Sequence, residues 1–166
     1  MKRSVVSGAF TALLLLSVAA SVQAEENCPR TIGSAGVFSE PWPQSATWYG
    51  SEGLAVMLTP DGTLSTTRPG ASLAVKYFWY SRSLASGGDL EAYQPGSEAE
   101  FVGRVERLDE GPNDAVMSPP TNAGGDSLGA WTILTGVDFP SPGCWKVTGN
   151  FRGQTLSFVV ETVPYG

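Results

Sequence analysis

The chain has 166 residues, no histidine, two cysteines and five tryptophans, with 16 acidic and 10 basic side chains. The absence of histidine excludes the Ser-His-Asp and Cys-His arrangements of hydrolases and most zinc and copper sites. The acidic balance disfavours nucleic acid and anionic lipid as partners, because both need a basic patch. We therefore expect no cofactor, no metal site and no nucleic-acid partner.

Residues 1–24 have the three parts of a secretory signal peptide. Lys2 and Arg3 form a basic start, an apolar run covers residues 12–20, and small residues precede the end at Ala24. The apolar run is too short for a membrane span, and no later run approaches the required length. We expect a secreted or periplasmic protein without membrane insertion of the mature chain.

The mature chain, residues 25–166, has the size of one domain. Removal of Lys2 and Arg3 leaves eight basic and sixteen acidic residues, a net charge of −8. Cys28 and Cys144 are its two cysteines, and in an oxidising compartment such a pair is most simply a structural disulfide. In the chain-entropy model, so long a loop contributes about 4 to 5 kcal/mol of stability. A redox pair is the alternative, although redox cysteines are normally close in sequence.

Short apolar runs bounded by turn residues predict many short strands, since no helical period persists along the mature chain. Residues 54–58 form the first clear strand. The turn Pro60-Asp61-Gly62 predicts that residues 63–67 return as its hairpin partner.

Residues 72–80 alternate between two faces of a strand. One face of this strand carries Leu73, Val75, Tyr77 and Trp79, and the other carries Lys76 and Phe78.

Residues 90–93 and 100–108 are more polar, as expected of strands near an edge or with one solvent-exposed face.

Residues 110–128, rich in Gly, Pro, Asn and Asp, predict a long surface loop that is either functional or disordered. Residues 131–139 and 144–151 then predict two strands, and the turn at Arg152-Gly153 returns the chain as residues 155–163. Seven to nine short strands favour an antiparallel two-sheet sandwich, with a closed barrel as the alternative.

One segment resembles known proteins. The run Phe139-Pro-Ser-Pro-Gly-Cys-Trp-Lys-Val-Thr-Gly149, followed by Leu156-Ser-Phe-Val-Val160, resembles the closing hairpin of immunoglobulin-like sandwiches in exported bacterial proteins. It is also similar to uncharacterised secreted bacterial proteins with a Gly-Cys-Trp strand opening near the carboxyl end. The stretches Trp48-Tyr-Gly-Ser-Glu-Gly-Leu54 and Lys76-Tyr-Phe-Trp-Tyr80 share in that likeness. The resemblance implies an immunoglobulin-like fold and carries no activity with it.

The chain departs from antibody domains at its first cysteine, because Cys28 precedes the first clear strand. We therefore expect the disulfide to attach the amino-terminal segment to the penultimate strand, and not to bridge the two sheets as in antibodies.

Aromatic residues are the first candidates for a ligand site, since exposed rings stack on sugars or peptides. Trp79 and Trp145 belong to alternating apolar faces and are expected in the core. Trp42, Trp48 and Tyr49 lie in a stretch without a period and are expected to be exposed, where they would form a ligand-binding platform.

Carboxylates supply the remaining candidates. A hydrolase would need two of them in one cleft, and Glu52 with Asp89 or Glu91 is the combination nearest to aromatic residues. A calcium site is a further candidate in the acidic stretch after residue 108, which offers hard oxygen ligands at irregular spacing. These ligands are Asp109, Glu110, Asn113 and Asp114.

We expect an exported, non-enzymatic recognition or accessory module with an unknown protein or glycan ligand. The alternatives are a carbohydrate-binding module that uses the exposed aromatic residues and a carboxylate-dependent hydrolase.

Overall fold

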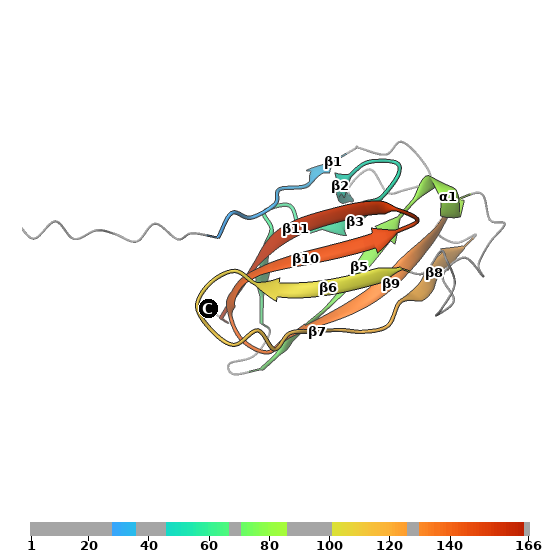
Figure 1. Cartoon of the computed structure of the whole chain (residues 1–166). Helices are drawn as coiled ribbons and strands as arrows, with labels where there is room; N and C mark the ends of the chain where they lie inside the picture. The colour runs from blue at the N-terminus through green and yellow to red at the C-terminus, as the bar shows by residue number, and fades with distance from the viewer. Residues whose placement is uncertain (1–27, 36–45, 67–70, 86–100, 126–129, 165–166) are drawn as a thin grey trace, which may run out of the picture.

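The computed structural model describes residues 28–35, 46–66, 71–85, 101–125 and 130–164. Two β-sheets packed face to face form this part of the chain, with one short helix beside them (Figure 1). The expected all-β, two-sheet fold is confirmed. In chain order the elements are β1 (Ser34–Ala35), β2 (Thr47–Gly50), β3 (Ala55–Leu58), β4 (Thr63–Ser65), β5 (Leu73–Tyr80), α1 (Arg82–Ala85), β6 (Val102–Arg107), β7 (Val116–Met117), β8 (Thr121–Gly125), β9 (Ala130–Phe139), β10 (Gly143–Phe151) and β11 (Gln154–Val163).

The larger sheet, called sheet A, has the order β1-β2-β3-β5-β9-β7, and β8 also pairs with β9. The smaller sheet, sheet B, has the order β4-β11-β10-β6. Every pair is antiparallel except β4 with β11, which run parallel. The predicted hairpin of β3 with residues 63–67 is therefore wrong. Because β2 and β5 occupy both sides of β3, the chain crosses after the turn to the edge of sheet B.

The predicted long loop at 110–128 is also wrong in part. Two strands, β7 and β8, lie within it, and both pair with β9. Their sequences have no alternating apolar pattern, so the edge offered by β9 accounts for their extended form. The predicted strand at 90–93 lies outside the described residues.

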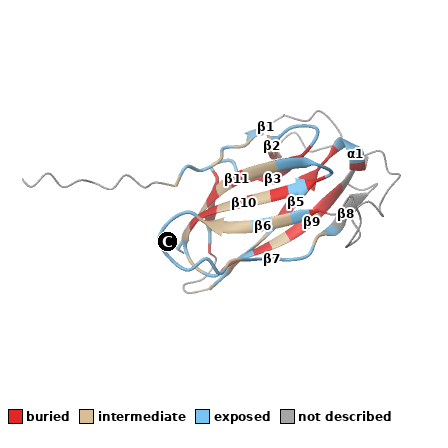
Figure 2. Ribbon diagram, viewed as in Figure 1, coloured by how far each residue is buried: buried red, intermediate tan, exposed pale blue. Residues whose placement is uncertain are grey.

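The core lies between the sheets and contains the alternating residues expected from the sequence (Figure 2). Trp79 and Trp145 are fully buried, and each indole N–H has a threonine acceptor. Trp79 Nε1 donates to Thr135 Oγ1 at 2.9 Å, and Trp145 Nε1 donates to Thr162 Oγ1 at 3.1 Å. These bonds satisfy the polar ends of the two rings, which would otherwise cost free energy in an apolar interior.

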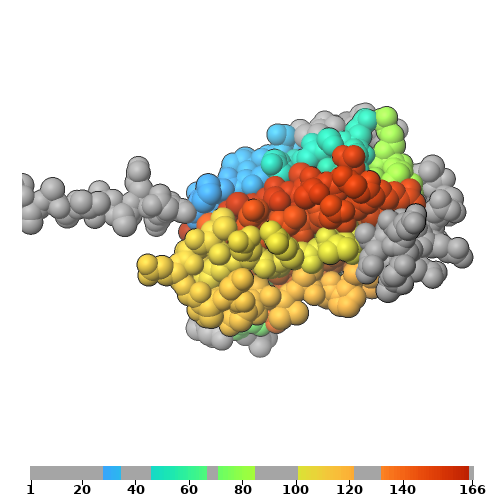
Figure 3. All heavy atoms as spheres, viewed as in Figure 1, coloured from blue at the N-terminus to red at the C-terminus, as the bar shows by residue number. Residues whose placement is uncertain are grey.

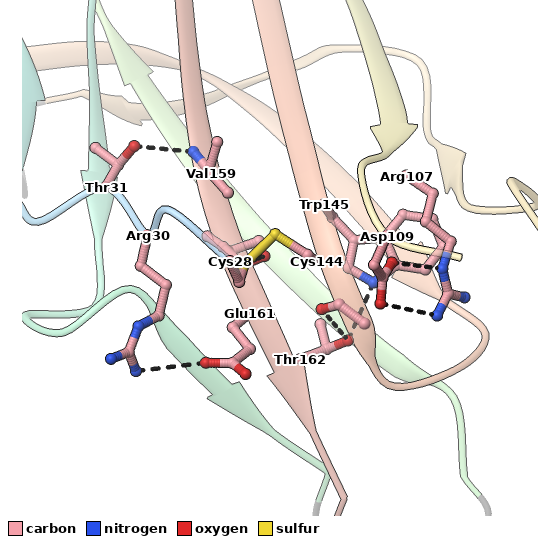
Figure 4. Close-up of a disulfide and its surroundings, with 12 residues drawn as sticks. Cys28, Arg30, Thr31, Arg107, Asp109, Cys144, Trp145, Val159, Glu161 and Thr162 are labelled. Atoms are coloured by element: carbon pink, nitrogen blue, oxygen red, sulfur yellow. Dashed lines mark hydrogen bonds and ion pairs between the residues drawn. A yellow bond between two sulfur atoms is a disulfide. The ribbon is translucent and has the colours of Figure 1, made fainter. Parts of the chain in front are cut away.

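The disulfide joins Cys28 to Cys144, as predicted, and attaches the amino-terminal segment to β10, the penultimate strand (Figure 4). Beside it, Thr31 N donates to Val159 O at 2.8 Å, and Val159 N donates to Thr31 Oγ1 at 2.9 Å. Figure 3 shows the segment, in blue, lying against the red β10–β11 hairpin. The segment therefore covers part of the free edge of β11.

A disulfide of this kind fits an oxidising compartment. Within the described residues, no helix has the length and apolar character needed to cross a membrane.

Candidate functional site

The expected aromatic platform is not formed by the residues that the structure describes. Trp48 lies in β2, is only 2% exposed, and packs edge-on against Tyr80 with ring centroids 6.3 Å apart. The expectation that Trp48 is exposed is therefore wrong. Pairing of β2 with β3 gives this stretch its strand form, which the aperiodic sequence did not indicate.

Trp48 and Tyr49 also point to opposite faces of sheet A, as neighbours in a strand must. Trp48 belongs to a small cluster with Ala55 and Tyr80, whereas the half-buried Tyr49 packs against the main core. One flat ligand cannot stack on both rings. Trp42 lies outside the described residues, and so does the side chain of Trp131.

The carboxylates proposed for hydrolysis are only partly described. Glu52 forms an ion pair with Arg82 in which both side chains are more than half exposed. Asp89 and Glu91 lie outside the described residues. Exposed pairs of this kind contribute little to stability.

The acidic stretch after β6 is used inside the fold. Asp109 Oδ1 accepts from Arg107 Nε at 2.7 Å, and Asn113 Oδ1 accepts from the main-chain N–H of Arg107 at 2.9 Å. Arg107 also donates to Ser141 and Pro142, and its guanidinium lies 4.9 Å from the ring centroid of Trp145. Two of the four proposed calcium ligands are thus engaged by Arg107. No group of three or more metal-ligating side chains occurs within the described ranges.

This pairing predicts a pH dependence of stability. Burial acts to raise the pKa of Asp109, but the hydrogen bond and charge of Arg107 and a main-chain hydrogen bond from Cys144 outweigh it and lower the pKa. A lowered folded-state pKa gives stability that is complete above the unfolded-state value, about 4, and is lost as pH falls through the folded-state value. We expect Asp109→Asn to destabilise the protein at pH 7 and to cost progressively less below pH of about 4.

Urea unfolding of wild type and Asp109→Asn at a series of pH values measures this difference. Asp114→Asn is the matched control, because Asp114 is exposed and has no ion pair among the described residues. A cost of Asp109→Asn that stays constant down to pH 2 would contradict the assignment.

The most distinctive feature of sheet A is a place where two neighbouring strands stop pairing. β3 and β5 pair only through Ala55 with Tyr80 and Val56 with Trp79. Continued in the same register, Met57 would face Phe78 and Leu58 would face Tyr77, but neither pair forms. The two strands therefore separate at this point.

A cavity of about 210 Å³ opens where they separate, and we call it the β3–β5 cleft. Leu64 of β4 and Val160 of β11 contribute to it from the opposite sheet. The full lining is Met57, Leu58, Thr59, Leu64, Val75, Lys76, Tyr77, Phe78 and Val160. Apolar walls with a few polar groups are typical of small-ligand sites.

Two of the lining residues carry hydroxyl groups without a hydrogen-bond partner among the described residues. The oxygen atoms are Thr59 Oγ1 and Tyr77 Oη, and both are buried. Burial raises the pKa of Tyr77, so the phenol stays neutral and keeps its proton to donate. Buried polar groups nearly always have a protein or water partner, so these two mark an unusual place in the fold.

A second hollow, of about 440 Å³, lies between β6 and β7. The hydroxyl in its lining belongs to Ser118, and this hydroxyl already accepts from Gly136 N at 2.7 Å. The β3–β5 cleft is therefore the better candidate site.

The sequence indicated only part of this site. The alternation of residues 72–80 placed Tyr77 on the core face, and a core tyrosine needs a partner for its hydroxyl. Nothing in the sequence showed that β3 leaves β5 after Val56, because that depends on the crossing of the chain to β4.

No protein-family profile matches this chain, and no curated protein matches it either.

Proposed function

We propose that this chain is an exported, non-enzymatic recognition or accessory module that binds its ligand in the β3–β5 cleft. One observation carries the proposal: a sheet that stops pairing leaves an apolar cavity lined by residues with unpartnered buried hydroxyls. A ligand that enters the cavity covers apolar surface and offers polar partners at the same time. Both effects favour binding.

Proton–nitrogen NMR spectra test this proposal with a panel of alkyl alcohols, alkyl amides, disaccharides and tetrapeptides. We expect at least one class to shift the amide signals of residues 57–59 and 75–78 together. Val75→Phe, which fills the cavity, is expected to weaken that binding tenfold or more.

Val105→Phe is the matched control, because Val105 is also half-buried in a strand but belongs to β6 and does not line the cleft. Equal binding by Val75→Phe and wild type would contradict the proposal. Shifts confined to other parts of the chain would contradict it as well.

A further inference from the structure

The pairing of β5 with β9 determines which edge of β5 each main-chain N–H and C=O group faces. Gly136 in β9 directs both its main-chain groups away from β5, because its N–H donates to Ser118 Oγ and its carbonyl accepts from Ser118 N. Lys76 is the cross-strand partner of Gly136. In an antiparallel pair of this kind both residues turn their N–H and C=O groups away from each other. The main-chain groups of Lys76 therefore point to the other edge of β5.

The main-chain N–H and C=O groups of Ala74 and Phe78 point to the same edge as those of Lys76. The reason is that these groups alternate between the two edges from one residue to the next, and the register with β9 is unbroken. This edge is the one that β3 leaves. The β3–β5 ladder ends with the Val56–Trp79 pair, in which the carbonyl of Phe78 accepts from Met57 N–H. It does not reach Ala74, Lys76 or the N–H of Phe78, and no other hydrogen bond to a described residue engages these groups. From Ala74 to the N–H of Phe78, β5 is thus an open edge beside the cleft.

Side chains along the same edge are incompletely covered. Leu73 and Val75 face the core but are only half-buried. Lys76 is exposed on the outer face and forms no ion pair with any described residue. An occupant of this edge would meet main-chain donors and acceptors, apolar surface on one face and a positive charge on the other.

We propose that an extended segment of a partner polypeptide adds to this edge of β5 as an antiparallel strand. Apolar side chains of the segment enter the cleft over Leu64 and Val160, and a carboxylate lies opposite Lys76. The inference rests on the proposed function, of which it specifies the ligand class.

Two features favour a polypeptide over a sugar or a small amphiphile. Main-chain groups recur at every second residue of β5, about 7 Å apart, and another β-strand has the same repeat. Charge complementarity adds to this, because opposite charges directly across two strands stabilise their pairing. Strand addition at a free sheet edge is a common mode of peptide recognition.

The probe is the peptide acetyl-Thr-Val-Glu-Val-Thr-Val-amide, with versions in which Leu, Ile or Phe replaces the valines. Hydrogen exchange of the full mature domain is measured with and without peptide. We expect at least one version to slow exchange at the amides of Ala74, Lys76 and Phe78 tenfold or more. N-methylation of the glutamate, whose N–H faces β5, should weaken binding at least tenfold, whereas N-methylation of the central valine should not.

A charge exchange supplies the second test. Lys76→Glu is expected to weaken binding of the glutamate peptide and to strengthen binding of a version with lysine in place of glutamate. Lys146→Glu is the matched control, since it makes the same change of charge on the outer face of sheet B. Equal effects of the two variants would overturn the pairing with Lys76.

Three results would overturn the inference: unchanged exchange at these amides with every peptide, protection already present in the free monomer, or protection that depends only on protein concentration. The last result would assign the edge to a second copy of the chain. Disaccharides or amphiphiles could shift the amide signals of the cleft residues while no peptide slows amide exchange in β5. In that case the proposed function stands and strand addition is wrong.

Discussion

Replacement of Cys144 by serine is expected to lower the free energy of unfolding by about 2 to 5 kcal/mol. The disulfide closes a loop between residues 116 apart in the sequence, and cross-links over long loops restrict the unfolded chain most. Its loss also detaches Cys28 from β10. The segment then depends on the Thr31 bonds to Val159, on Arg30, which pairs with the half-buried Glu161 and donates to Thr63, and on the pairing of β1 with β2. Chemical denaturation of residues 25–166 measures the change.

Controls separate the cross-link from the side chain itself. Cys28→Ser and the double variant should unfold at the same denaturant concentration as Cys144→Ser, because each removes the same bond. Thiol titration of the native wild type should find no free cysteine. A loss below about 1 kcal/mol, less than such bonds usually contribute, would show that the hydrogen bonds at Thr31 hold the segment without sulfur.

Gly149→Val is expected to destabilise the domain by about 1 to 3 kcal/mol, with Gly149→Ala smaller in the same direction. A Cβ atom at Gly149 would lie 2.7 Å from the rings of both Trp79 and Phe101. Trp79 cannot move aside without weakening its bond to Thr135 in a fully packed core. The rings of Trp79 and Phe101 thus leave no room for a side chain at this position of β10. Thermal unfolding measures the loss of stability.

Gly53→Ala is the matched control. A Cβ atom there meets the end of the exposed Gln154 side chain at 3.1 Å, which can rotate away. The expected change is within about 0.5 kcal/mol, as for most surface substitutions. If both glycine variants lose the same stability, crowding against Trp79 and Phe101 would not be the cause of the loss at Gly149.

Prediction of strands and their core residues from the sequence was most accurate where one face of the strand is buried and the other is exposed to solvent. β5 and β10 alternate so regularly that their core residues, Trp79 and Trp145 among them, were identified correctly. The tight turn at Arg152-Gly153 likewise gave the β10–β11 hairpin, since the two residues take φ of 48° and 75°. Local pattern was sufficient in these cases for two reasons. The alternation of β5 and β10 by itself marks the buried face of each strand, and β10 and β11 are neighbours both along the chain and in space.

Prediction failed where pairing is not local. Trp48 is buried because β2 pairs with β3 and places its ring against Tyr80, a contact between residues far apart in the sequence. β4 pairs with β11, from the other end of the chain, although its turn residues suggested a hairpin. β7 and β8 are strands because β9 offers them an edge.

The amino-acid sequence by itself determined the all-β class, the pairing of Cys28 with Cys144 and the core face of the longest strands. Each of these follows from composition or from a period of two, which the chain carries locally. Only the tertiary structure decided where β3 and β5 separate, and hence where the cleft and the open edge at Lys76 lie. That position results from the crossing of the chain between sheets, and such a crossing depends on packing between residues that the sequence keeps far apart.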